Sequence, residues 1–329
     1  MKSYLGFWEQ LQKPFFVLAP MANVTDVVFR RMIAKYGRPD VMWTEFVSAD
    51  GLCHPKGRQA LLRDLEYVEC ERPIVTQLFT AHPEKMYEAA KFVASLGFDG
   101  IDINMGCPDK NVMKQGAGAS LMKDPALAQA VILAAMEGVE ASGKRIPVSV
   151  KTRLGFNEDT LDEWLPKLLE TKPAVITVHC RTKKEMSKVP AKWERVKRAV
   201  EIARGSGTLI VGNGDVRDCA DAEEKARETG CDGVMLGRAV FGNPWLFDRK
   251  KQDVTVREKL EVAIEHTKLF EETWRDTKSF DLMKKHYQAY INHFPLAKEL
   301  RVELMICQNA EDVKKSIEKF LKTHGDIAA

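Results

Sequence analysis

Short apolar segments alternate with longer stretches of helical periodicity through most of the chain. The eight apolar segments each end in small or polar residues and span 15–22, 41–49, 73–79, 100–107, 148–155, 174–182, 209–216 and 233–240. Their length and turn-like ends predict β-strands. Between them, segments such as 83–97 and 124–143 predict helices, the second closing on a glycine where a C-cap is expected. Eight such units in about 240 residues predict an α/β fold, a (β/α)8 TIM barrel; the alternative, a doubly wound sheet, rarely needs so many evenly spaced units.

The alternation stops after residue 247, and only helical patterns follow. They span 256–274, 279–294, 297–308 and 310–324, and Pro295 separates the second from the third. Asn309 precedes the last pattern, with Asp312 three residues later, which is typical of a helix N-cap followed by a first-turn acid. We therefore expect two domains, a TIM barrel over 1–247 and a small C-terminal helical domain over 248–329.

Composition narrows the class of protein only a little. The 329 residues are 45% hydrophobic and 29% charged, as in an ordinary globular protein, and a net charge of +3 is too small to indicate a nucleic-acid partner. Seven cysteines without a C-x-x-C pair predict reduced thiols, with no disulfide framework and no metal site. The absence of a signal peptide and of a long apolar run predicts a cytoplasmic protein with no membrane association.

Polar and small residues gather at the carboxyl ends of the predicted strands, where TIM barrels carry their active sites. They are Met21, Ala22, Gln77, Asn104, Cys107, Lys151, Arg153, His179, Arg181, Asn213, Gly214, Asp215, Gly237 and Arg238. Any one of them could be an ordinary hydrogen-bonding residue at a strand end. Because seven of the eight predicted strands contribute, the set together predicts a ligand site.

The last two predicted strands end in glycine-containing turns. Loops after the seventh and eighth strands of such barrels commonly bind phosphate, and Arg238 would add a charged fork to the backbone donors there. Lys151, His179 and Gln77 would then face a flat heteroaromatic ring with a phosphate tail, for which FMN is the natural candidate. Lys151 would stabilise the negative charge of the reduced ring, and Gln77 would bond its donor and acceptor edge. An ion pair between Lys151 and a barrel acid is the alternative.

Six blocks of sequence resemble those of the tRNA-dihydrouridine synthases, closest to the bacterial general type. They read LAPMANVTD, INMGCPDKNVMKQGAGASLMKDP, VKTRLG, VHCRT, VGNGDV and GVMLGRAVFGNPWLF, spread over 15–247, and the resemblance continues through 283–305. It implies an FMN-binding barrel, a helical domain that helps to bind tRNA, and reduction of the C5–C6 bond of uridine with NADPH or NADH. It also implies that FMN is held by Pro20, Met21, Ala22, Gln77, Lys151, His179, Asn213, Gly214, Asp215, Gly237 and Arg238, and that Cys107 is the proton donor.

Cys107 suits that role on chemical grounds. Reducing a uracil ring adds a hydride to one carbon and a proton to its neighbour, and a thiol with a pKa of ~8.5 is mostly protonated at neutral pH. Asn104 could bond the uracil edge, with Arg153 and Arg181 as further substrate contacts. The glycines of 110–120 predict a mobile cover that carries Cys107 inward. An inert thiol is the alternative.

The nucleic-acid partner has weaker support in the residues themselves. Segment 181–198 is rich in lysine and arginine and would lie beside the barrel mouth, where it could contact phosphates, although such a run is often only a solvated surface. We expect a monomer that acts on tRNA without an obligate protein partner. Two other classes stay open: an FMN-dependent barrel oxidoreductase acting on a small pyrimidine-like molecule, of the dihydroorotate dehydrogenase type, and a noncatalytic RNA-binding module.

Overall fold

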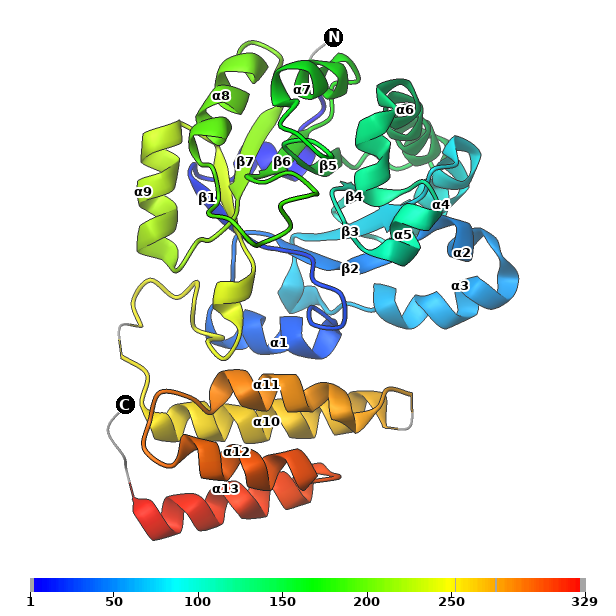
Figure 1. Cartoon of the computed structure of the whole chain (residues 1–329). Helices are drawn as coiled ribbons and strands as arrows, with labels where there is room; N and C mark the ends of the chain where they lie inside the picture. The colour runs from blue at the N-terminus through cyan, green and yellow to red at the C-terminus, as the bar shows by residue number, and fades with distance from the viewer. Residues whose placement is uncertain (1–2, 252, 276, 326–329) are drawn as a thin grey trace. The chain divides into compact units, whose positions relative to one another are not determined.

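The computed structural model describes residues 3–251, 253–275 and 277–325 (Figure 1). The outer ends of the two expected domains, residues 1–2 and 326–329, lie outside the described residues. The chain forms two compact units. The barrel unit takes the residues up to Val27 together with Pro39–Gly237, and the helical unit takes Val28–Arg38 together with the residues from Arg238 onward.

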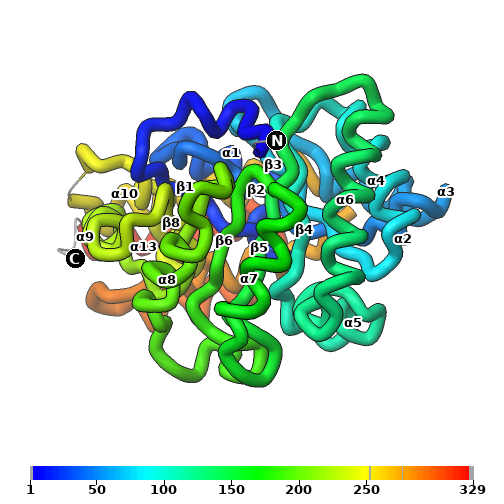
Figure 2. The backbone as a smooth tube through the Cα atoms, turned by 90° about the horizontal axis from the view of Figure 1, so that it is seen from above, coloured from blue at the N-terminus to red at the C-terminus, as the bar shows by residue number. Residues whose placement is uncertain are grey.

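Eight parallel strands form the wall of the barrel unit. They are β1 (Phe15–Leu18), β2 (Met42–Ser48), β3 (Ile74–Phe79), β4 (Gly100–Met105), β5 (Val148–Arg153), β6 (Val175–His179), β7 (Leu209–Asn213) and β8 (Gly233–Leu236). They pair in the order β1-β8-β7-β6-β5-β4-β3-β2, and a parallel bridge from Val17 to Val41 brings β1 to the chain just ahead of β2. The sheet thus curls into a ring, with helices around it (Figure 2). The predicted TIM barrel is confirmed, and the doubly wound alternative is wrong.

Helices surround the strands of the barrel unit, and the helices expected over 83–97 and 124–143 are confirmed. They are η1 (Gly6–Gln10), α2 (Ala49–Cys53), α3 (Pro55–Leu61), η2 (Leu62–Leu65), η3 (Glu69–Glu71), α4 (Pro83–Ser95), α5 (Lys110–Lys114), η4 (Gly118–Lys123), α6 (Pro125–Ala141), α7 (Leu161–Glu170), α8 (Glu194–Ala203) and α9 (Cys219–Thr229). The Asp124 side chain caps α6 by accepting from the Leu127 amide, and Gly143 follows its end with φ +72°. Among the described residues, no helix is both long and apolar enough to cross a membrane.

Apolar side chains fill the amino-terminal half of the barrel interior. Trp8 of η1 is 1% exposed and packs against Phe15 and Trp43, with ring centroids 5.4 and 5.8 Å away. Both of these residues lie near the start of their strands, as do Val75 and Leu209 in the same cluster. Because large apolar side chains close this end of the barrel, the polar residues are left to the carboxyl ends of the strands.

The helical unit contains the predicted C-terminal helices and one helix from earlier in the chain. Its elements are α1 (Val27–Tyr36), η5 (Arg238–Val240), α10 (Val256–Trp274), η6 (Phe280–Met283), α11 (Lys284–Tyr290), α12 (Ala297–Ile306) and α13 (Ala310–His324). Asn309 caps α13 by accepting from the Asp312 amide at 2.8 Å, as its sequence predicts. The helix expected over 279–294 divides into η6 and α11.

Charged and aromatic contacts explain why α1 groups with the C-terminal helices. Lys35 and Tyr36 both donate hydrogen bonds to the Glu265 carboxylate of α10, at 2.6 Å each. The Phe29 ring lies 5.9 Å from the ring of His266 and 5.3 Å from that of His286. The helix that follows the first strand therefore packs in the core of the helical unit.

Candidate active site

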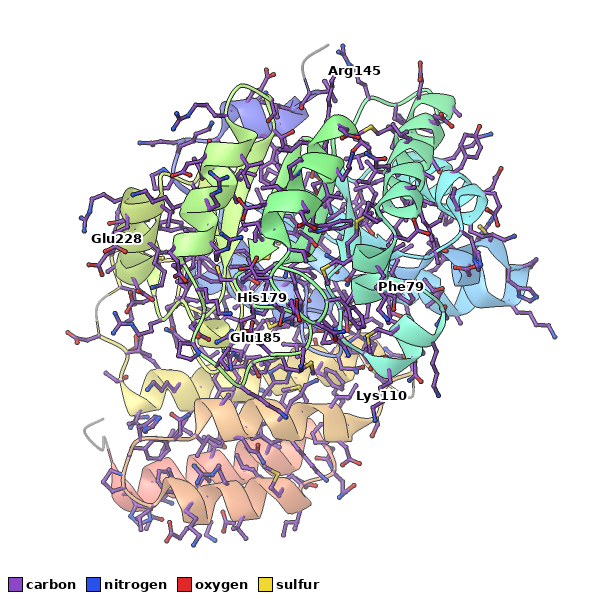
Figure 3. The ribbon with its side chains drawn as sticks, turned by 45° about the horizontal axis from the view of Figure 1, so that its top comes forward. Phe79, Lys110, Arg145, His179, Glu185 and Glu228 are labelled. Carbon is purple, nitrogen blue, oxygen red and sulfur yellow. The ribbon has the colours of Figure 1, made fainter. Side chains whose placement is uncertain are left out.

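A cavity of about 200 Å³ opens at the carboxyl ends of the strands within the barrel unit. Its lining consists of Pro20, Phe46, Gln77, Asn104, Gly106, Cys107, Pro108, Lys151, Arg153 and His179. Seven of the residues predicted from the sequence are thus brought together in one place. Figure 3 shows His179 at the end of β6 and Phe79 at the end of β3, with Arg145 at the other end of the barrel.

Strand register places these side chains side by side. Asn104 of β4 is level with Lys151 of β5, and Arg153 is level with His179 of β6. Alternate residues of a barrel strand point to the same face, so Lys151 and Arg153 share the interior face of β5. The β5 sequence therefore contributes two cations to the cavity from positions two residues apart.

A chain of hydrogen bonds connects Gln77 to the backbone of Cys107. The Asn104 amide nitrogen donates to Gln77 Oε1 at 2.9 Å. The Asn104 side-chain oxygen accepts from the backbone amides of Gly106 and Cys107, at 3.2 and 2.9 Å. Asn104 therefore holds the turn that carries the thiol. Its position three residues before Cys107 lets its side-chain oxygen reach the backbone amides of that turn.

Asp102 lies beneath this chain and was missed in the sequence analysis. Its carboxylate is fully buried and accepts hydrogen bonds from Gln77 Nε2 and Ser149 Oγ, at 2.6 Å each. Burial raises the pKa of Asp102 to about 6, while the hydrogen bonds from Ser149 and Gln77 act in the opposite direction. Strand alternation could have identified it, because Asp102 shares a face with Asn104 two residues later.

Lys151 is held in the cavity by an amide rather than by an acid. Its ammonium donates to Asn213 Oδ1 at 3.2 Å, and the Asn213 amide nitrogen in turn donates to the Met235 carbonyl at 2.8 Å. No carboxylate in the described part of the chain forms an ion pair with Lys151, so the alternative of a barrel ion pair is wrong. Burial, assisted by the nearby charge of Arg153, lowers the pKa of Lys151 to about 8.

The Cys107 thiol lines the cavity and packs against a small apolar cluster. Phe79, Val112 and Ala117 form that cluster, and Cys107 is only partly buried against it. Burial raises the pKa of the Cys107 thiol above its ordinary value, although a hydrogen bond with the Asp109 backbone acts in the opposite direction. The thiol is therefore protonated at neutral pH.

The segment after Cys107 is more ordered than the glycine-rich sequence predicts, since it forms α5 and η4. Asp109 caps α5, accepting from the amides of Asn111 and Val112. Gly118 has φ +59°, and a Cβ there would lie 2.9 Å from the Cys107 carbonyl oxygen. Glycine is thus required where the loop closes on the thiol. The expected movement of this cover stays a prediction.

Two predicted substrate contacts, Arg153 and Arg181, have most of their donors committed to the protein. Arg153 donates to the carbonyls of Gly106, Thr182 and Met186 at 2.8, 3.2 and 3.1 Å. Arg181 is 2% exposed, donates to the Val189 carbonyl at 2.6 Å and forms an ion pair with Asp215. These guanidinium groups fix the loop after β6, and a direct contact with substrate stays a prediction.

The remaining predicted residues lie outside the cavity lining. They are Met21, Ala22, Asn213, Gly214, Asp215, Gly237, Arg238 and Arg181. Gly214 and Asp215 both have positive φ values, +135° and +50°, and the Asp215 carboxylate also accepts from the Ala191 amide at 3.0 Å. Arg238 is the first residue of η5 and is grouped with the helical unit.

The sequence matches known proteins over nearly its whole length. A sequence model of the dihydrouridine synthases (Dus) matches residues 17–324. A Staphylococcus aureus (strain MRSA252) protein named "Probable tRNA-dihydrouridine synthase" is 38% identical over 320 residues, covering 96% of this chain and 95% of that protein. The Bacillus subtilis (strain 168) "Probable tRNA-dihydrouridine synthase 2" is 38% identical over 327 residues, covering 98% of each.

Solved structures share the barrel at low sequence identity. Morphinone reductase in complex with tetrahydroNAD gives a TM-score of 0.51 at 14% identity, covering 74% of this chain and 88% of that one. The 6-hydroxypseudooxynicotine amine oxidase of Pseudomonas geniculata N1 gives 0.53 at 12% identity, covering 71% and 46%. At such identities the likeness concerns the fold alone. The match of the family model and of these relatives along almost the entire sequence shows that the chain belongs to the dihydrouridine synthase family.

Proposed function

We propose that this protein is an FMN-dependent tRNA-dihydrouridine synthase, a cytoplasmic monomer that reduces the C5–C6 double bond of uridine in tRNA with NADPH or NADH. One observation carries the proposal beyond family membership. A protonated thiol, a buried ammonium and an amide with unused donor and acceptor positions line the same cavity at the strand ends.

The residues around the cavity are suited to a flavin. Gln77 uses one N–H and one lone pair on protein partners, which leaves one donor and one acceptor for the mixed edge of the ring. Lys151 has N–H groups beyond the one bonded to Asn213, so it would hold negative charge on the reduced ring. When bound, FMN would supply the transfer of hydride from the nicotinamide to the base.

The turn after β8 supports the expected phosphate site. A Cβ built on Gly237 would meet only Ala19 and Met21, at ordinary contact distances of 3.5 and 3.7 Å. Among the described residues, therefore, no steric contact with a Cβ requires glycine at this position. Close approach of a ligand phosphate to the backbone would provide the reason, with Arg238 as the expected charged contact.

Cys107 would donate the proton that completes the reduction. Its S–H bond breaks as a new C–H bond forms at the ring carbon next to the one that receives hydride, and the thiolate is later reprotonated from water. The raised pKa keeps the proton on sulfur until that moment. The positive charges of Lys151 and Arg153 favour the thiolate and would stabilise it after the transfer.

The target base must leave the stack of the tRNA to enter the cavity, so phosphates must pass close to its rim. A basic and aromatic cluster lies on segments joined to the cavity: the ammoniums of Lys123 and Lys183 lie 3.9 and 4.7 Å from the centre of the Phe156 ring. Neither lysine forms an ion pair within the described residues. We name Lys123, Phe156 and Lys183 the rim cluster and propose that it contacts tRNA phosphates.

Backbone contacts fix the rim cluster relative to the thiol. Lys183 donates its amide to the Gly155 carbonyl at 2.9 Å, which sets the basic segment beside Phe156. Lys123 ends η4, and the Ala119 amide within η4 donates to the Cys107 carbonyl at 3.0 Å. The two lysines thus come from the loops after β4 and β6. The first of these loops lines the cavity through Gly106, Cys107 and Pro108, and the second follows the lining residue His179.

The helical domain, expected over 248–329, is proposed to add tRNA contacts. Tyr287, Tyr290 and Phe294 of the segment 283–294 do not provide them, because these rings are buried in the helical unit, whereas His293 is exposed. Lys284 pairs with Asp281 at 2.5 Å. Contacts from this unit would therefore come from its exposed residues rather than from these buried rings.

The proposal is tested with purified protein, FMN, NADPH or NADH, and unmodified tRNA. We expect a yellow protein that forms dihydrouridine, detected by mass spectrometry of tRNA digests, and that leaves free uracil and orotate unreduced. A protein that binds no flavin after reconstitution would contradict the cofactor assignment. Reduction of orotate without any effect on tRNA would instead favour the small-molecule oxidoreductase.

A further inference from the structure

The buried carboxylate of Asp102 determines which way two amide side chains face. An ionised carboxylate can only accept hydrogen bonds, so the group of Gln77 that faces it must be the NH₂ group. Gln77 Oε1 then faces Asn104, which must present its own NH₂ group. The Asn104 oxygen is left for the amides of Gly106 and Cys107, which can only donate.

The donor and acceptor directions of this chain are therefore set from both ends. Asp102 fixes one end, and the backbone amides of the Cys107 turn fix the other. Reversing Gln77 alone would place its oxygen against the carboxylate and its NH₂ against the NH₂ of Asn104. In a buried site each such mismatch leaves polar groups without partners, at a cost of about 1–3 kcal/mol. Only one arrangement satisfies every group.

We propose that Asp102 is a positioning residue of this site: it orients the Gln77 amide toward the flavin ring and, through Asn104, couples that orientation to the turn carrying Cys107. The inference rests on the proposed function. It assigns a task to a fully buried acid that does not itself line the cavity and reaches it only through Gln77. The contact with Ser149 anchors the carboxylate from its second oxygen.

This orientation has a consequence for recognition of the ring. With Nε2 on Asp102 and Oε1 on Asn104, Gln77 keeps one N–H and one oxygen lone pair in fixed places. When FMN is bound, the Gln77 oxygen would accept from its ring N3–H only while the amide keeps Nε2 toward Asp102 and Oε1 toward Asn104. FMN methylated at N3 lacks that hydrogen and should bind the wild-type protein more weakly, by roughly tenfold or more, as expected when a buried acceptor loses its donor.

The experiment compares the affinities of FMN and N3-methyl-FMN for apoprotein, measured by quenching of flavin fluorescence. Asp102→Ala releases Gln77, so the affinity for FMN should fall about tenfold and the preference for FMN over its methylated form should largely disappear. Asp102→Asn should retain the preference. Its oxygen can accept from Gln77 while its NH₂ group donates to the Ser149 hydroxyl, whose proton can turn to the Ile101 carbonyl 3.3 Å away.

Thr177→Val is the matched control. Thr177 is 1% exposed on β6, level with Lys151, and its hydroxyl has no hydrogen-bond partner among the described residues. This substitution disturbs the buried interior of the barrel without touching Gln77, so the preference between the two flavins should stay at the wild-type value. A folded Asp102→Ala protein that keeps the full preference would overturn the inference.

A second measurement covers the case in which Asp102→Ala does not fold. Gln77→Glu places a second carboxylate against Asp102 and should weaken FMN binding strongly. Combining it with Asp102→Asn supplies an NH₂ donor to the new carboxylate and should restore part of the affinity, whereas independent sites would give additive losses. Additivity would overturn the inference. Failure of the wild-type protein to bind either flavin would instead contradict the proposed function.

Discussion

Replacing both lysines of the rim cluster gives the most direct test of the tRNA-binding surface. Each neutralised phosphate contributes about 0.7–0.9 to the slope of log K against log salt concentration. Lys123 and Lys183 lack carboxylate partners among the described residues, so both charges are available to phosphates. The double variant Lys123→Gln/Lys183→Gln should therefore lower the magnitude of the slope by about 1.4–1.8, if each lysine neutralises one phosphate.

The same arithmetic gives the loss of affinity. At 0.1 M salt, a slope change of about 1.4–1.8 corresponds to a tRNA affinity lowered by roughly 25- to 60-fold. The assay is a fluorescence titration of labelled unmodified tRNA at several salt concentrations between about 0.05 and 0.2 M, a range over which phosphate contacts change affinity strongly. Flavin content and oxidation of the nicotinamide without tRNA should stay unchanged, because the rim cluster does not line the cavity.

Lysines at the opposite end of the barrel provide the control. Lys144 and Lys172 line a separate cavity with Arg145, the residue that Figure 3 places away from His179. Lys144→Gln/Lys172→Gln removes the same total charge, so it measures the contribution of net charge alone. Equal slopes for the two double variants would refute a local phosphate contact at the rim cluster.

Three further predictions follow from the site and the helical unit. Cys107→Ala should retain FMN binding and flavin reduction, but unmodified tRNA should oxidise the prereduced enzyme ~10²–10⁴-fold more slowly, and Cys107→Ser should behave similarly. A rate near that of the wild type, measured by stopped-flow absorbance, would show that the thiol takes no part in the reaction. Arg238→Ala should weaken FMN binding roughly tenfold to a hundredfold by losing a charge-assisted contact, as measured by fluorescence quenching, and unchanged affinity would place the phosphate elsewhere. Burial, together with the charges of His266 and Lys285, holds the pKa of His286 well below 6.5, so the unfolded state takes up its proton first as pH falls. The contribution of neutral His286 to the free energy of unfolding should be fully present above about pH 6.5. It should decrease below that pH by up to about 1.4 kcal/mol per pH unit. His286→Phe should flatten this loss, as measured by urea titrations between about pH 7.5 and 5.

The sequence by itself determined the class of fold and the location of the chemistry. Eight apolar segments with polar ends became the eight strands, and the helical pattern of 256–274 became α10 with the same bounds. These features are local: strand and helix periodicities, and caps such as Asn309, depend on residues close together in the chain. A parallel barrel requires the strand ends to meet, which is why the sequence alone groups Gln77, Cys107 and Lys151.

Tertiary structure alone decided which polar partner each of these residues takes. Lys151 bonds the amide of Asn213 rather than an acid, and Asp102 lies under Gln77 because β3 and β4 pair in a register that sets them level. It also decided that α1 packs with α10, through contacts between residues about 230 positions apart. Local patterns specify which face of a strand or helix is buried. The partner that satisfies a buried polar group depends on register and on packing between distant segments, which those patterns do not encode.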